Sequence, residues 1–301
     1  MRINHRITGT HDDPFWQEIE RIGLDYERGV PHKICPGISV LNVTEDQHEW
    51  PDVEAAIAAS RSVRDTISNR FTSHELDSAE WLVMHALGHH GYPQPEDNFG
   101  YKEATYDVSD YCAFCGIGAT QKAPFRLRAE PKAAHSQFLQ LNWVFDQYFL
   151  RAEARDGIRS QGISGVEFLA PVIHKNGLPS QRVSQLVVKD TLGSALDPSG
   201  LQPVTCREHN EEWLAYGLAR ANGLKDQVFC GRVKYHFVHR GPLRFDGDAF
   251  IGAPDVVRSH EWFGSGASAF NLIVVKQKFR QLVVQSKWRG VYFEPLDLVK
   301  A

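Results

Sequence analysis

Two stretches in the second half of the chain follow the same pattern, and this internal repeat most constrains the fold. The pattern predicts a helix, a glycine at Gly165 and a strand in FLQLNWVFDQYFLRAEARDGIRSQGISGVEFLAPV, and strand, helix, Gly290 and strand in FNLIVVKQKFRQLVVQSKWRGVYFEPLDLV. Both copies contain Gly-Val-x-Phe, in which glycine closes the helix and a β-branched and an aromatic residue favour a strand. We therefore expect Phe168 and Phe293 at equivalent, buried positions in one mixed sheet.

The first hundred residues are polar and rich in turns, and their apolar periodicity predicts helices. PFWQEIERIGL and WPDVEAAIAASRSVRDTI have helical spacing, and a capping box formed by Asp77 and Glu80 predicts a third helix, AEWLVMHALG, that ends at Gly88. Prolines and glycines between Tyr92 and Asp107 mark a connection. We therefore predict an α+β protein with a helical N-terminal region, residues 1–105, and a domain at residues 106–301 that combines the repeat with a zinc-knuckle-like element.

The cysteines point to a metal rather than to disulfides. Five cysteines in 301 residues form an odd and sparse set, unlike the framework of a small secreted domain. Cys112 and Cys115 form a CxxC pair, which is half of a tetrahedral zinc site, and Gly116 relaxes the backbone after it. Cys206 and His209 have the spacing of a second half-site. These four residues would make a closed, structural Cys3His zinc site.

Other assignments of the cysteines stay open at this point. Cys230, in VFCGRV, is the main competitor of His209 for the fourth position, and Cys35, just before a Pro-Gly pair, is a weaker one. A lone cysteine is also often just a small, buried apolar residue. The CxxCG spacing nevertheless favours a metal site that contains Cys112 and Cys115.

These motifs carry a resemblance to a known family. The elements CAFCG and LQPVTCREH, with the C-terminal block FNLIVVKQKFRQLVVQSKWRGVYFEPL, resemble the double-CxxCG paralogous family of predicted bacterial immunity proteins of polymorphic toxin systems. The resemblance spans roughly residues 111 to 301. It implies a cytoplasmic protein that binds and neutralises a toxin domain and has no catalytic residues. The family's second element is CxxCG, whereas this chain has histidine, His209, where the second cysteine would stand.

An enzymatic function is the alternative hypothesis. His85 and His89 are four residues apart, with His90 adjacent, which is a spacing by which a helix can chelate zinc in a metal-dependent hydrolase. The general-base glutamate of the metalloprotease motif is replaced by Ala86, and Gly88 is expected to end the helix between the histidines. Residues at a helix end therefore explain these histidines better than a catalytic site does.

Charge and hydropathy exclude some classes of partner. A net charge of -4 gives no overall electrostatic footprint for nucleic acid or for an anionic membrane, so we expect neither as a partner. The N-terminus lacks the apolar segment of a signal peptide, and no apolar run is long enough to span a bilayer, so a soluble, cytoplasmic protein is expected. The acidic stretch TEDQHEWPDVE, with Glu45 and Asp46, is a candidate recognition patch for a basic protein partner.

Overall fold

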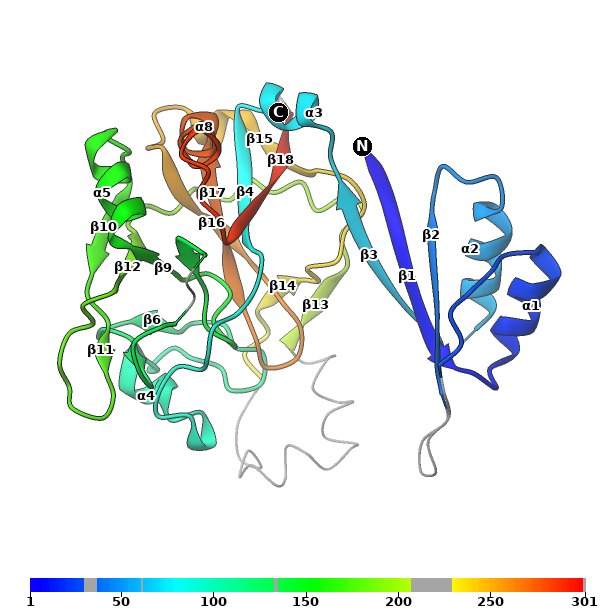
Figure 1. Ribbon diagram of the computed structural model, residues 1–301, viewed down its shortest axis with the longest axis horizontal. Helices are drawn as coiled ribbons and strands as arrows, with labels where there is room; N and C mark the ends of the chain where they lie inside the picture. The colour runs from blue at the N-terminus through cyan, green and yellow to red at the C-terminus, as the bar shows by residue number, and fades with distance from the viewer. Residues whose placement is uncertain (30–36, 61, 133–134, 207–228, 300–301) are drawn as a thin grey trace. The chain divides into compact units, whose positions relative to one another are not determined.

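The chain forms two compact units, each with its own sheet and helices (Figure 1). Unit 1 comprises Met1–Glu75 with Val238–Pro242, and unit 2 comprises Leu76–Phe237 with Leu243–Ala301. The structure is a computed structural model, and it describes residues 1–29, 37–60, 62–132, 135–206 and 229–299. Helices, two antiparallel sheets of three and four strands, and a mixed seven-stranded sheet together confirm the α+β class.

Unit 1 is a three-stranded antiparallel sheet with both of its long helices on one face (Figure 1). The strand order is β2-β1-β3, with bounds β1 Arg2–Thr10, β2 Ile38–Thr44 and β3 Arg64–Arg70. The helices are α1 (Pro14–Ile22) and α2 (Trp50–Ala59). One face of the sheet and both helices bury an apolar core, made of Ile7, Phe15, Trp16, Ile19, Leu41, Val43, Trp50, Val53 and Ala56.

The helix α1 forms within the predicted segment PFWQEIERIGL, and neighbouring residues set both of its ends. Asp13 accepts a hydrogen bond from the N–H of Phe15 at 2.9 Å, Pro14 occupies the first turn, and Gly23 ends the helix with φ +88°. Helix α2 also forms as expected, but it ends at Ala59, and the last residues of the predicted helix, 64–67, belong to β3 instead. The N-terminal region is therefore not helical as a whole: it begins with β1, and its helices serve to cover a sheet.

Unit 2 is built on a seven-stranded mixed sheet in the order β13-β14-β16-β17-β4-β18-β15. A second sheet has the order β10-β12-β9-β8, and two small sheets pair β11 with β7 and β5 with β6. The bounds are α3 Ser73–Ser78, β4 Trp81–Ala86, η1 Asp97–Phe99, α4 Tyr101–Thr105, β5 Tyr106–Asp107, β6 Thr120–Gln121, β7 Arg126–Leu127, β8 Phe138–Leu139, β9 Tyr148–Arg151, α5 Ala152–Ser160, β10 Val166–Leu169, β11 Val172–Ile173, β12 Val183–Val188, β13 Pro203–Thr205, β14 Val233–Tyr235, β15 Leu243–Asp246, η3 Gly247–Phe250, β16 Val256–Phe263, β17 Phe270–Lys276, α8 Gln277–Gln285 and β18 Val291–Val299.

The segment AEWLVMHALG, predicted as a helix, is the strand β4, and this corrects the sequence prediction. Residues 81–84 are each no more than 2 % exposed, because β4 lies between β17 and β18 inside the sheet. A short apolar run buried on both faces has no periodicity that separates a strand from a helix. The capping box also lies elsewhere, between Thr72 and Glu75 at the start of α3. The strand β4 belongs to unit 2, and the two compact units divide after Glu75. The domains expected from the sequence, residues 1–105 and 106–301, stay a prediction.

Each copy of the internal repeat consists of a strand, a helix and a second strand. The two strands pair with opposite edges of a third strand that lies between them. In the first copy β9 and β10 both pair antiparallel with β12, and in the second β17 and β18 both pair antiparallel with β4. The registers agree. Leu186 of β12 lies opposite both Tyr148 and Phe168, and Met84 of β4 lies opposite both Ile273 and Phe293. The helix of the first copy is α5, whereas the apolar segment before it, predicted as helix, forms β8 and β9.

The glycine of each copy packs closely against the backbone of the sheet that contains the other copy. A Cβ atom on Gly165 would lie 2.1 Å from the carbonyl oxygen of Val256, in the strand beside β17. A Cβ atom on Gly290 would lie 2.0 Å from the carbonyl oxygen of Phe138, in the strand beside β9. Both glycines have positive φ, +85° and +109°. The repeat therefore requires glycine at both places for conformation and for space.

One apolar core joins the two copies of the repeat. It contains buried side chains from α5, α8 and the strands of both copies, with Phe279 fully buried. Phe168 and Phe293 occupy equivalent strand positions as predicted, but they lie in two different sheets rather than in one: Phe168 is in β10 of the four-stranded sheet and Phe293 is in β18 of the seven-stranded sheet. Both side chains are partly buried against this core rather than fully enclosed. In the described part of the chain, no helix has the length and hydropathy needed to cross a bilayer.

Candidate metal centre

Cys112 and Cys115 lie in a tight turn that the following glycine makes possible. The N–H of Gly116 donates to the carbonyl of Cys112 at 2.8 Å, and the N–H of Cys112 donates to the carbonyl of Ile117 at 2.9 Å. Gly116 has φ +83°, and a Cβ atom there would lie 2.6 Å from the carbonyl oxygen of Ala267. The predicted role of this glycine is therefore confirmed, because any other residue would be strained and would collide.

Cys206 and Cys230 come from the adjacent ends of two antiparallel strands. Cys206 directly follows β13, and Cys230 precedes β14, which pairs with β13 through Thr205 and Val233. The N–H of Cys206 donates to the carbonyl of Arg232 at 3.0 Å, so the pairing continues to the cysteine itself. Strand pairing thus brings together two cysteines that are far apart in sequence.

The four sulfur atoms form a compact cluster. All four lie within 4.8 Å of one another, with Sγ separations of 3.6 Å from Cys112 to Cys206 and from Cys115 to Cys230. A tetrahedral ion with bonds of about 2.3 Å holds its sulfur ligands about 3.8 Å apart. A disulfide would need about 2.05 Å. The thiols are therefore free, and their spacing fits a bound metal ion.

Apolar side chains surround the cluster and limit the access of water. Cys112, Cys115 and Cys206 are buried, and Cys230 is exposed. The buried core around them contains Phe114 and Ile117, with Phe229, Trp262 and Ala269 packed against it. An ion here would have one exposed ligand and three enclosed ones, which is the environment of a structural site.

Two basic residues of β14 and the segment before it hold the two halves of the site together. The guanidinium of Arg232 donates to the carboxylate of Asp110 at 2.8 Å and to the backbone carbonyl of Asp110 at 2.7 Å. Lys234 is 1 % exposed, and its Nζ donates to the carbonyls of Cys115, Gly266 and Ser268 at 2.6 to 2.8 Å. A divalent ion with four thiolates carries two negative charges, which these two cations offset.

The protonation of the thiols follows from the same surroundings. Burial raises the pKa of Cys115 and of Cys206 above the usual value. Burial also acts on Cys230, but hydrogen bonds from the side chain and backbone of Arg232 outweigh it and lower the pKa to about 6. Burial lowers the pKa of Lys234 to about 8, although the nearby thiols oppose this shift. Metal binding must release the protons of the buried thiols, so metal affinity rises with pH.

Replacing Lys234 by methionine is expected to weaken metal retention and lower stability. The buried carbonyl of Cys115 and the partly buried carbonyls of Gly266 and Ser268 lose their donor, at a cost of about 1–3 kcal/mol for a buried group left unpaired. The measurements are the rate of metal loss to a chelator and the denaturant midpoint. Lys189→Met, at a lysine whose side chain is 53 % exposed, is the matched control. Equal behaviour of the two variants would contradict the role given to Lys234.

The structure brings three of the four predicted ligands together with Cys230, the residue that competes with His209 for the fourth position. His209 lies outside the described residues, as does Cys35, so the assignment of His209 stays a prediction. A signal for Cys230 was present in the sequence: Cys230-Gly231 repeats the Cys115-Gly116 pair. Gly231 has φ +69°, a conformation that favours glycine, as at Gly116.

The three histidines of the alternative hypothesis do not converge. His85 lies on β4, where its ring stacks on Tyr292 and its Nε2 lies 3.6 Å from Glu294. His89 packs edge-on against Phe145. The pKa of His90 is lowered, first by burial and then by the charge of the neighbouring His89. Within the described ranges, the four cysteines are the only group of three or more potential ligand side chains. No chelating helix carries the histidines, since residues 81–86 are a strand.

The acidic stretch after β2 is largely engaged within unit 1. Glu45 lies 3.1 Å from Nε2 of the buried His5 and 3.4 Å from Arg240, and Asp46 pairs with Arg2 at 3.0 Å. Asp52 on α2 is exposed and has no ion pair with another described residue. A substitution at Asp52 therefore tests the surface charge of this stretch alone, whereas a substitution at Glu45 also removes a contact with His5.

No model of a known protein family matches the chain, and no curated protein matches it.

Proposed function

We propose that this chain is a binding protein of the immunity type, which neutralises a toxin domain, and that a structural zinc ion stabilises unit 2. The observation that carries the proposal is the closed cluster of Cys112, Cys115, Cys206 and Cys230. Four protein ligands would leave no open position for water or substrate, which is how structural sites differ from catalytic ones.

Zinc is the ion that the donor set favours. Thiolates are soft ligands, and a tetrahedral arrangement of four of them is typical of zinc or of iron–sulfur centres. The cluster is held by a CxxC turn and by a strand pair, as in compact structural zinc sites. The basic groups of Arg232 and Lys234 add a charge environment that suits a tetrathiolate. When bound, zinc would cross-link the turn after β5 to the strands β13 and β14.

The resemblance to the double-CxxCG family supports the binding function. Cys115-Gly116 and Cys230-Gly231 both contribute to the cluster, so the chain has two Cys-Gly elements. The hydrolase alternative finds less support, because His85, His89 and His90 make separate contacts. A binding protein also needs no reacting group beside the metal.

Co-expression with the toxin domain encoded beside this chain should restore growth. The complex should be recovered from the lysate, and Cys112→Ser should protect less well because the metal-bound region is lost. If the acidic stretch contacts a basic toxin, Asp52→Lys should weaken association by about tenfold, with a steeper effect at low salt. Glu45→Lys is the control for misfolding, since it also breaks the contact with His5. Cells that stay unprotected, with no complex recovered, would reject the immunity role.

A further inference from the structure

The open face of the unit 1 sheet, on the side away from α1 and α2, carries four arginines. The register places Arg2 opposite Arg70, Arg6 opposite Thr66 and Thr8 opposite Arg64, so these side chains share one face. Asn4, Ser68, Asn42 and Thr44 lie on the same face between them. His5, Ile7, Leu41 and Val43 point to the other face, into the core. We call this polar surface the arginine face.

Charge is separated between the two sides of this unit. All four arginines are exposed. The one carboxylate within the three strands is Asp65, and it faces the other way, where it accepts a hydrogen bond from His5 at 2.8 Å. The only ion pair of the face with another described residue joins Arg2 to Asp46. Arg6, Arg64 and Arg70 have no carboxylate partner among the described residues.

Such an arrangement costs stability unless an anion covers it. Like charges directly opposite each other on neighbouring strands destabilise a sheet, and Arg2 and Arg70 are such a pair. Arginine is also the side chain best suited to phosphate, because its planar fork donates two parallel hydrogen bonds. The arginine face therefore fits a ligand with several negative charges.

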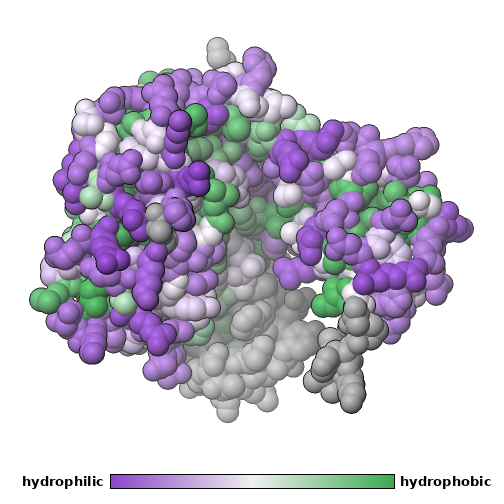
Figure 2. All heavy atoms as spheres, in the orientation of Figure 1, coloured by the Kyte–Doolittle hydropathy of each residue, from purple (hydrophilic) through white to green (hydrophobic). Residues whose placement is uncertain are grey.

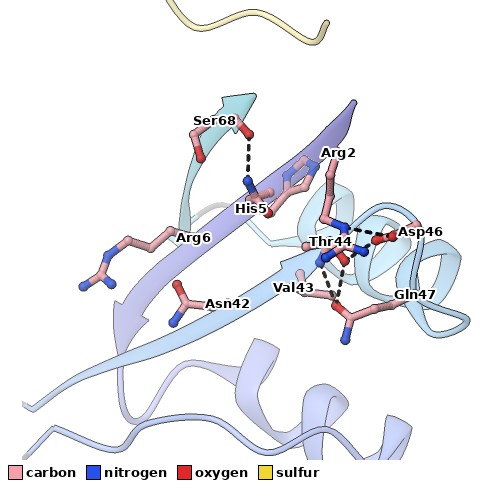
Figure 3. A pocket seen from close by; sticks show the side chains of 10 residues that line it. Arg2, His5, Arg6, Asn42, Val43, Thr44, Asp46, Gln47 and Ser68 are labelled. Atoms are coloured by element: carbon pink, nitrogen blue, oxygen red, sulfur yellow. Dashed lines mark hydrogen bonds and ion pairs between the residues drawn. The ribbon is translucent and has the colours of Figure 1, made fainter. Parts of the chain in front are cut away.

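A polar hollow lies on this face beside the arginines. It is lined by Arg2, Asn4, Arg6, Asn42, Thr44, Asp46, Gln47 and Ser68, with Val43 and His5 beneath (Figure 3). Figure 3 shows Arg6 and Asn42 at one end of the hollow and the Arg2–Asp46 pair at the other. Amides and hydroxyls beside arginines are the groups that contact phosphate and sugar oxygens in nucleic-acid complexes.

We propose that the arginine face binds the phosphodiester backbone of a nucleic acid. An acidic protein would fit this face less well than a nucleic acid. Interfaces between proteins have a core of apolar or aromatic side chains, and no exposed side chain of that kind lines this hollow. Interfaces with nucleic acid are more polar and more positive. Ile38 is the exposed apolar residue of β2. It is the first residue of that strand, whereas the hollow lies near the last one, Thr44. The net charge of -4 belongs to the whole chain, whereas binding depends on the local field.

The test is fluorescence anisotropy of the full-length chain with a labelled 12-nucleotide single-stranded RNA and, separately, a DNA duplex of the same length. We expect saturable binding in 50 mM salt that weakens steeply at 200 mM. Arg6→Gln, Arg64→Gln and Arg70→Gln combined should raise Kd at least tenfold and make the slope of log K against log salt shallower by about 2–3. The comparison between the two probes shows which form of nucleic acid is preferred.

The control variant is Arg21→Gln combined with Arg28→Gln, which removes two arginines that pair with glutamates of α1. It should bind as the unchanged protein does. The triple variant should melt at the same temperature or higher, since repulsion on the sheet is relieved, so lost binding will not reflect unfolding. Absence of binding to both probes, unchanged binding by the triple variant, or equal competition by polyglutamate would overturn the proposal. Equal competition would identify an acidic protein surface instead.

Discussion

Cys112→Ser is expected to abolish metal binding at the cysteine cluster and to lower the stability of the protein steeply. Protein purified without added metal should contain close to one zinc per chain, and the variant should contain almost none. The free energy of unfolding should fall by more than about 4 kcal/mol, because a structural metal couples its binding energy to folding. Elemental analysis and denaturant unfolding measure the two effects. Metal-free wild-type protein, with melting unaffected by the substitution, would contradict the metal centre.

The fourth ligand can be decided with two further variants. The cluster predicts that Cys230→Ser lowers the zinc content, since Cys230 lies 3.6 Å from Cys115. The sequence prediction assigns the same effect to His209→Ala. Cys35→Ser is the control, because it removes the one cysteine that is not among the proposed ligands. Loss of zinc in the histidine variant alone would show that the predicted Cys3His set is the correct one.

Gly290→Ala should destabilise unit 2 by about 2–5 kcal/mol. The positive φ of +109° is unfavourable for alanine by about 1–2 kcal/mol, and the added Cβ would meet the carbonyl of Phe138 at 2.0 Å. Relief of that collision requires backbone movement, and overpacking of this kind costs about 1–3 kcal/mol more. Thermal and denaturant unfolding measure the loss. Gly165→Ala, at the equivalent place in the first copy, should have a similar effect.

Gly252→Ala separates conformational strain from the collision. Gly252 also has positive φ, +75°, but no other atom lies within 4 Å of the position of its Cβ. The expected cost is about 1–2 kcal/mol, from the backbone conformation alone. If Gly290→Ala cost no more than Gly252→Ala, the close packing of the two copies of the repeat would be disproved.

Local sequence signals determined the parts of the fold that depend on neighbouring residues. The ends of α1 follow from Asp13, Pro14 and Gly23, which act on the backbone beside them. The repeat was visible because each copy needs the same glycine and the same strand residues after its helix. The CxxCG turn was visible for a similar reason: two ligands and their glycine lie within five residues.

The strand β4 shows where local signals end. Its apolar residues fit a helix or a buried strand equally well, and the choice depends on β17 and β18, which follow almost two hundred residues later. Its place between them is the place that β12 takes in the first copy, where the central strand comes after the helix. Sequence order therefore hides the likeness of the two central strands.

For the metal centre, the sequence by itself determined Cys112, Cys115 and Cys206 as candidate ligands and the glycine that shapes the turn. Only the tertiary structure placed Cys230 with them, because the pairing of β13 with β14 sets which residues meet at the strand ends. The arginine face was decided in the same way. Its residues are scattered along two strands, and only the register of β1 with β3 puts Arg2, Arg6, Arg64 and Arg70 on one side. Spacing along the chain fixes local turns and caps, whereas hydrogen-bonded register fixes which distant side chains share a surface.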